Sequence, residues 1–131
     1  MKIALASLAL LSLSGVAIAQ ETETPAPVIT MELVDLPIDQ QAALRCGVAI
    51  AIATEQQRAG RAANPEWPDL LANERGREFF VRTMAKLMDD TGMAREGLAL
   101  RGRKEAEELR DPAALEAVMP ACVLMLDASG L

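Results

Sequence analysis

The most apolar internal stretch of the chain, "AALRCGVAIAIA" over residues 42–53, has Arg45 as its only charged residue. A helix that is apolar nearly all round is typical of a central, buried helix, since it has no face suited to water. The run is too short to cross a bilayer, which takes roughly 20 apolar residues. The pattern therefore predicts a central helix over residues 39–60, with Asp39 as a possible cap and Gly60 near its end.

The segments on the C-terminal side of this helix are amphipathic or polar. Residues 68–90 carry an apolar stripe that includes Phe80, Met84 and Leu87, opposite a face rich in charges, which predicts a helix packed on a core. Residues 93–110 form the most polar segment and contain two internal glycines, Gly97 and Gly102. This composition predicts a solvent-facing helix of lower stability.

The last segment begins with Asp111 and Pro112, which suit the cap and the first position of a helix. Pro120 either splits this segment, over about 112–118 and 120–127, or kinks one continuous helix. The stretch "VITMELVDL" alternates like a strand but has no second β-type run to pair with, so it is expected as extended chain. The chain is thus predicted to be all-α, a small bundle of four to five helices.

The first residues, "MKIALASLALLSLSGVAIAQ", have the layout of a secretory signal peptide. Lys2 gives the positive start, an apolar run follows, and Ala17 and Ala19 suit the positions before a cleavage site. Cleavage is predicted between Ala19 and Gln20. An uncleaved membrane anchor is the alternative, which the shortness of the apolar run disfavours. The predicted organisation is a signal peptide over 1–19, a mobile leader over 20–37 and a single helical domain over 38–131.

Export through a Sec-type signal to the periplasm, or beyond the cell, changes the interpretation of the two cysteines. In an oxidising compartment an isolated, even pair is usually a disulfide, and the absence of a CxxC motif gives no support to a redox site. Cys46 and Cys122 are therefore predicted to join the central helix to the C-terminal segment. The large ring that this bond closes corresponds to roughly 4 kcal/mol of stability in the chain-entropy model.

Charge and motifs exclude several classes of function. The net charge of −6 argues against binding to nucleic acid or to anionic membranes. The chain has no histidine, which removes the usual serine and cysteine triads and the histidine-containing zinc sites. It also lacks GxxxxGK[ST] and GxGxxG motifs. We expect no enzyme, no cofactor and no metal centre, and we expect the many carboxylates to be solvated surface charges.

The methionines are the one unusual feature. Met84 and Met88 lie one helical turn apart, and thioethers bind Cu(I). Methionine also fills gaps in a core with few aromatic residues, and methionine-rich faces adapt to varied partners. The sequence therefore favours a non-enzymatic exported protein that binds another protein or stabilises an envelope assembly. The alternative is a carrier of a small ligand or of Cu(I) that uses Met84 and Met88.

Overall fold

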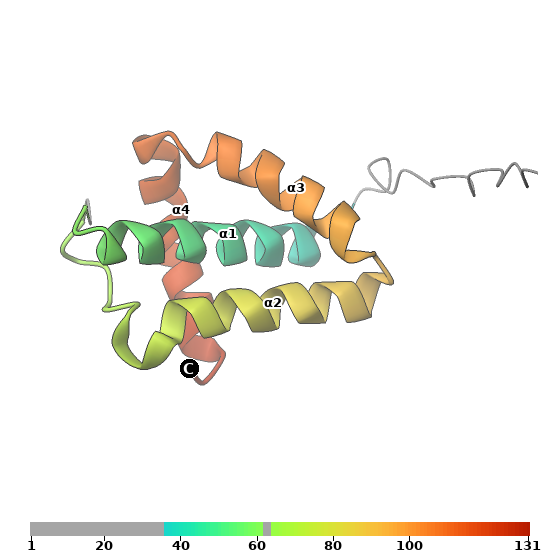
Figure 1. Cartoon of the computed structure of the whole chain (residues 1–131), viewed down its shortest axis with the longest axis horizontal. Coiled ribbons are helices and arrows are strands. Elements are labelled where there is room, and N and C mark those ends of the chain that lie inside the picture. The colour runs from blue at the N-terminus through green and yellow to red at the C-terminus, as the bar shows by residue number, and fades with distance from the viewer. Residues whose placement is uncertain (1–35, 62–63) are drawn as a thin grey trace, which may run out of the picture.

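The computed structural model of the chain describes residues 36–61 and 64–131. Its elements are α1 (Ile38–Arg58), the 3₁₀ turn η2 (Ala72–Glu74), α2 (Arg75–Thr91), α3 (Arg95–Glu108) and α4 (Pro112–Ala128) (Figure 1). The described residues contain no strand, so the all-α prediction is confirmed. The predicted signal peptide, its cleavage between Ala19 and Gln20, and the leader as far as residue 35 lie outside the described residues.

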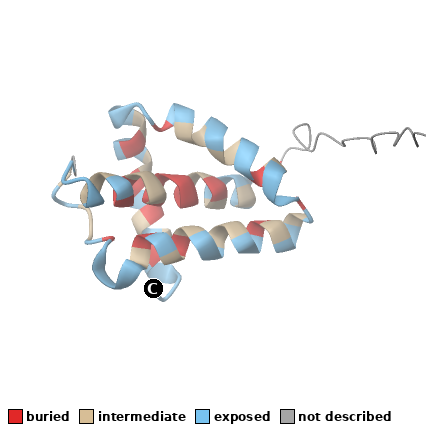
Figure 2. Cartoon of the chain, in the orientation of Figure 1, coloured by how far each residue is buried: buried red, intermediate tan, exposed pale blue. Residues whose placement is uncertain are grey.

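Helix α1 is the centre of the arrangement. Helices α2 and α3 run along it on either side, and α4 crosses its far side (Figure 1). Cys46, Ile50 and Ala53, which the helical spacing places on one face, are all buried, the last two completely. Figure 2 shows that buried positions are concentrated along α1, whereas α2 and α3 are largely exposed on their outer sides. The apolar run thus forms the central helix that the sequence predicts.

The disulfide between Cys46 and Cys122 joins α1 to α4, as predicted. The Cα atoms of the two cysteines are 4.9 Å apart, within the usual range for a disulfide, and the bond spans 76 positions of sequence. No free cysteine occurs among the described residues. None of the described helices is both long enough and apolar enough to cross a membrane.

Helix α4 is continuous through Pro120, so the predicted split of this segment into two helices does not occur. Asp111 caps the helix as expected, because its Oδ1 accepts a hydrogen bond from the amide of Ala113 at 3.0 Å. Pro120 is exposed, while Met119 and Cys122 on either side of it are buried. Packing of this buried face on α1 therefore holds the turns before and after the proline together.

The predicted start of the second helix was wrong, because α2 begins at Arg75 rather than near residue 68. Gln57 on α1 holds the preceding loop: its Nε2 donates to the carbonyl of Pro68, and its Oε1 accepts from the amide of Leu70, both at 2.8 Å. Asn73 and Glu74 then take positive φ angles of 52° and 55°, which interrupt any helix. The two hydrogen bonds of Gln57 thus hold residues 68–70 in a loop, although the local sequence pattern favours a helix there.

Two smaller expectations were also wrong. Asp39 lies in the first turn of α1, but its side chain makes no capping hydrogen bond there, and Pro37 occupies the cap position. On α2 the deeply buried aromatic residue is Phe79, which is 3% exposed, whereas Phe80 is only half-buried. Helix α2 is therefore rotated so that Phe80 lies at the edge of the core.

A close approach between α1 and α2 depends on Gly76. A Cβ atom at this position would lie 2.0 Å from Oγ1 of Thr54 and 3.1 Å from Cβ of Leu70. The Thr54 side chain is itself fixed, because it is buried and its hydroxyl donates to the carbonyl of Ile50 at 2.6 Å. The absence of a side chain at Gly76 lets the start of α2 close on α1.

Removing the disulfide should destabilise the chain strongly. We expect Cys46→Ser to lower the free energy of unfolding by about 4 kcal/mol, because the long ring opens. This loss corresponds to a fall in melting temperature of roughly 15–30 °C, measured by circular dichroism. A Cys46→Ala/Cys122→Ala variant, which adds no buried hydroxyl, should melt like the reduced parent protein. Melting curves that coincide with the oxidised parent would contradict the role given to the bond.

Two glycine substitutions separate close packing from helix propensity. Gly76→Ala should lower the free energy of unfolding by about 1–3 kcal/mol, since its Cβ has no space. Gly102→Ala on α3 is the matched control, because a Cβ there would make only an ordinary van der Waals contact with the described residues of the other helices, at 3.9 Å from Cγ2 of Val48. There the gain in helix propensity should raise stability by about 0.5–1 kcal/mol. Equal effects of the two changes in urea titrations would refute the close approach.

Candidate functional site

The described part of the chain contains an open groove with a volume of about 1080 Å³. Helix α1 forms its floor, with Val48, Ala51, Ile52, Glu55 and Gln56, and Arg61 lies just beyond the helix. One wall comes from α2, with Phe80, Val81, Met84, Ala85 and Met88. The other comes from α3, with Arg95, Leu98, Ala99, Gly102, Arg103 and Ala106.

The groove exists because α2 and α3 both pack on α1 but scarcely on each other. They approach one another near the connection between them and then diverge along α1 (Figure 1). Ala51 and Ile52 are consequently only half-buried, although the sequence predicts an α1 covered nearly all round. The structure leaves one apolar strip of α1 partly open.

Small residues shape both walls. A Cβ at Gly47 of α1 would lie 2.6 Å from the terminal methyl carbon of Met84, so this methionine packs directly on the backbone of α1. On α3, Ala99 and Gly102 keep the wall thin, because neither has a side chain that reaches across the groove. The walls therefore expose mainly methyl groups and flexible methionine side chains, which suit an apolar occupant.

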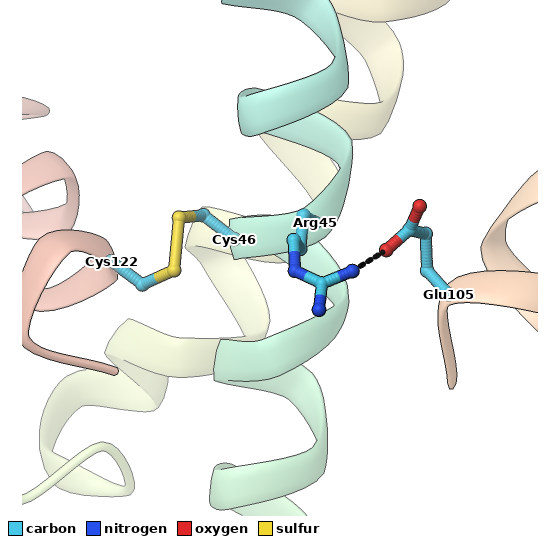
Figure 3. The surroundings of a disulfide bond; sticks show 4 residues. All are labelled: Arg45, Cys46, Glu105 and Cys122. Carbon is cyan, nitrogen blue, oxygen red and sulfur yellow. Dashed lines mark hydrogen bonds and ion pairs between the residues drawn. A yellow bond between two sulfur atoms is a disulfide. The ribbon is translucent and has the colours of Figure 1, made fainter. Parts of the chain in front are cut away.

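Arg45 and Cys46 are adjacent on α1 and attach different helices to it. The Nη1 atom of Arg45 lies 2.7 Å from Oε2 of Glu105 and 3.0 Å from Oε2 of Glu108, both on α3. The hydrogen bond with Glu108 is the main cause that raises the pKa of Arg45, and burial partly opposes it. In Figure 3 the Arg45–Glu105 pair and the disulfide to Cys122 lie on opposite sides of α1. The single charge in the apolar run thus secures one wall of the groove.

The edge of the groove on the α3 side is basic. The guanidinium groups of Arg95 and Arg103 have no hydrogen-bond or ion-pair partner among the described residues. Among the described residues, Glu55 is the only carboxylate that lines the groove, and its side chain pairs with Arg58. An apolar groove with unpaired positive charge along one edge therefore occurs in a chain whose net charge is −6.

One polar atom near the floor lacks a partner. Gln56 lines the groove, and its Oε1 atom is buried without a hydrogen bond in the described part of the chain. A buried amide oxygen without a donor costs roughly 1–3 kcal/mol. The floor of the groove thus combines apolar side chains with a single unsatisfied acceptor.

The methionines of the described residues differ in burial and position. Met84 and Met88, which the sequence singles out, are half-buried and line the groove together. Met93 and Met119 are buried in the core, and Met125 is half-buried outside the groove. Met31 lies outside the described residues. Both cysteines are engaged in the disulfide, so no thiolate can join the two groove methionines as a metal ligand.

The carboxylates of the described residues do not cluster into a metal centre. No three or more of the Asp, Glu, Cys and His side chains there are arranged to hold a metal ion. Glu105 and Glu108 bind Arg45, and Asp90 forms a 2.8 Å ion pair with Lys86 that raises the pKa of this lysine. These pairs show structural roles for three of the acidic residues.

The α3 wall was not predicted from the sequence, because this helix was expected to be mainly solvent-facing. Only Leu98 of α3 is fully buried, which agrees with that expectation. The overlooked signal is the spacing of Leu98, Ala99, Gly102 and Ala106, which places small or apolar residues on one side of an otherwise charged helix. Flanking arginines at 95 and 103 complete the pattern.

Comparison with known proteins adds no assignment: no family model, curated protein or solved structure matches this chain.

Proposed function

We propose that this chain is a non-enzymatic, exported binding protein whose groove receives an amphipathic helix of a partner protein. The observation that carries the proposal is the open apolar groove between α1, α2 and α3. A helix that lies in such a groove buries its apolar face against the floor and walls. The partner helix would lie beside α1 and cover the strip that α2 and α3 leave partly open.

The dimensions of the groove favour a helix over a small molecule. Its volume of about 1080 Å³ lies just above the range of small-ligand pockets, which span roughly 300–1,000 Å³. At 1.5 Å per residue, the α2 wall from Phe80 to Met88 is about 12 Å long, and the α3 wall from Arg95 to Ala106 is about 16.5 Å long. These lengths correspond to about two and about three turns of a bound helix.

The character of the walls supports the same function. Val81, Ala85 and Ala99 are exposed apolar positions on the outer parts of the walls. Met84 and Met88 lie deeper, and their unbranched side chains can adjust to the shape of an incoming helix. Burial of such a surface provides the driving force for association, since binding removes apolar area from water.

The proposed location is the periplasm or the extracellular space, where the protein would act alone or in an envelope assembly. The N-terminal sequence motivates this proposal, and a disulfide between Cys46 and Cys122 is compatible with an oxidising compartment. A partner in the same compartment is therefore the relevant one.

Site-specific photo-crosslinking tests the proposed function. With p-benzoylphenylalanine in place of Ala99, irradiation of cells should give a covalent adduct with one partner protein, mapped by mass spectrometry to an amphipathic helical segment. The same group in place of Ala121, which is exposed on α4 away from the groove, should give no such adduct. The proposal fails if adducts at the two positions are the same, or if position 99 crosslinks to a lipid or to residues 20–35 of this chain.

The second candidate is a carrier of Cu(I) or of a small ligand. It is favoured by one observation, the shared position of Met84 and Met88 on the groove wall. Two thioethers one turn apart are a possible soft-metal pair.

A competition assay with a coloured Cu(I) chelator separates the two candidates. If the groove is a protein-binding surface, Met84→Leu/Met88→Leu should leave the Cu(I) affinity unchanged, because the methionines serve as packing groups. Met125→Leu, which alters a thioether outside the groove, is the control. A loss of Cu(I) binding confined to the double variant would establish the carrier instead.

A further inference from the structure

We infer that the partner helix is acidic along one edge, with carboxylates spaced to meet Arg95 and Arg103; this inference rests on the proposed function. The first step is the contrast between these two groove arginines and six basic side chains that form ion pairs within the described chain: Arg45, Arg58, Arg75, Arg77, Arg82 and Lys86. Arg61, Lys104 and Arg110 have no such pair among the described residues either, but of these three only Arg61 lines the groove. The charges of Arg95 and Arg103 are instead left free at the groove.

The second step is their placement along one wall. Arg95 and Arg103 are eight positions apart on α3, which puts their Cα atoms about 12 Å apart along the helix axis. Ala99 and Gly102 lie between them and add no charge and little bulk. The outer part of the opposite wall carries Val81 and Ala85, which are uncharged. The groove is therefore basic on the α3 edge and apolar on the α2 edge.

The third step is the match with a helical occupant. Two residues seven apart in a helix lie nearly on one line along its surface, since seven residues make almost two full turns, and they are about 10.5 Å apart. Carboxylates at such positions can each meet one of the two arginines, with the long arginine side chains taking up the small difference. A fatty acid has one carboxylate and can pair with only one of them. The spacing of Arg95 and Arg103 therefore favours a helix with two carboxylates along one edge over a fatty acid with a single carboxylate.

The fourth step is the size of the effect. Exposed ion pairs contribute modestly, so two of them should strengthen binding by about 2- to 30-fold. Their larger effect is on specificity and register, because a helix with basic residues on that edge is repelled. The attraction should weaken as salt shortens the screening length from about 10 Å at 0.1 M to about 3 Å at 1 M.

The test uses the full, oxidised chain and three synthetic helical peptides of about 18 residues, long enough to form helix. All three carry the same stripe of leucine and alanine and differ only at two edge positions seven apart, which hold Glu, Gln or Lys. By fluorescence anisotropy we expect the Glu peptide to bind about 2- to 30-fold more tightly than the Gln peptide, and the Lys peptide to bind most weakly. The differences should shrink at high salt.

Two sets of variants link the preference to the groove. Arg95→Gln/Arg103→Gln should make the Glu and Gln peptides bind equally well. Arg77→Gln/Arg82→Gln removes the same charge from exposed positions of α2 outside the groove and should leave the preference intact. Ala99→Trp should weaken the binding of all three peptides, because the indole fills the groove; its circular dichroism spectrum checks that the chain remains folded.

The outcomes separate the inference from the function on which it rests. If Ala99→Trp prevents binding but all three peptides bind the parent equally, the groove remains a helix-binding site and the acidic edge is refuted. The acidic edge is refuted as well if the preference for Glu survives Arg95→Gln/Arg103→Gln. If none of the peptides binds, or if Ala99→Trp leaves the binding of all three unchanged, both the proposed function and the inference fall.

Discussion

The rest of the structure depends on one constraint: α1 is apolar nearly all round and must be covered by its neighbours. Two adjacent residues attach neighbouring helices to α1: Cys46 bonds covalently to α4, and Arg45 pairs with Glu105 of α3 (Figure 3). Arg45 also pairs with Glu108 of α3. Glycines let α2 approach closely, at Gly76 against Thr54 and at Gly47 beneath Met84. Three short helices still leave a strip of α1 partly open, because α2 and α3 diverge.

The resulting groove differs from a simple packing defect in its composition. The α3 wall carries Ala99 and Gly102 and the floor carries Ala51, so small residues at these positions leave the space between the helices open. The charges at the groove are also distinctive. Arg95 and Arg103, which have no partner among the described residues, line one edge of the groove, although the chain as a whole is acidic. An apolar strip with a basic edge is suited to a partner that is apolar on one face and acidic beside it.

The sequence predicts those features that depend on local pattern. The all-apolar run identifies the central helix, the isolated cysteine pair predicts its bond to α4, and Asp111 with Pro112 marks the start of that helix. The start of α2 could not be predicted, because it depends on a clamp by Gln57 onto a loop distant in sequence. The groove could not be predicted for a related reason. It depends on the divergence of α2 and α3, which is set by tertiary packing, and the hydrophobic pattern along each helix does not determine the angle between them.

The central claim, that the open strip of α1 is a binding surface, is tested most directly by NMR of methionine methyl groups. Met84 and Met88 report on the groove, and Met119, which is fully buried, reports on the core. On titration with a helical peptide that has an acidic edge, the methyl signals of Met84 and Met88 should shift while that of Met119 stays in place. Unchanged signals from Met84 and Met88, or a shift centred on Met119, would contradict the account.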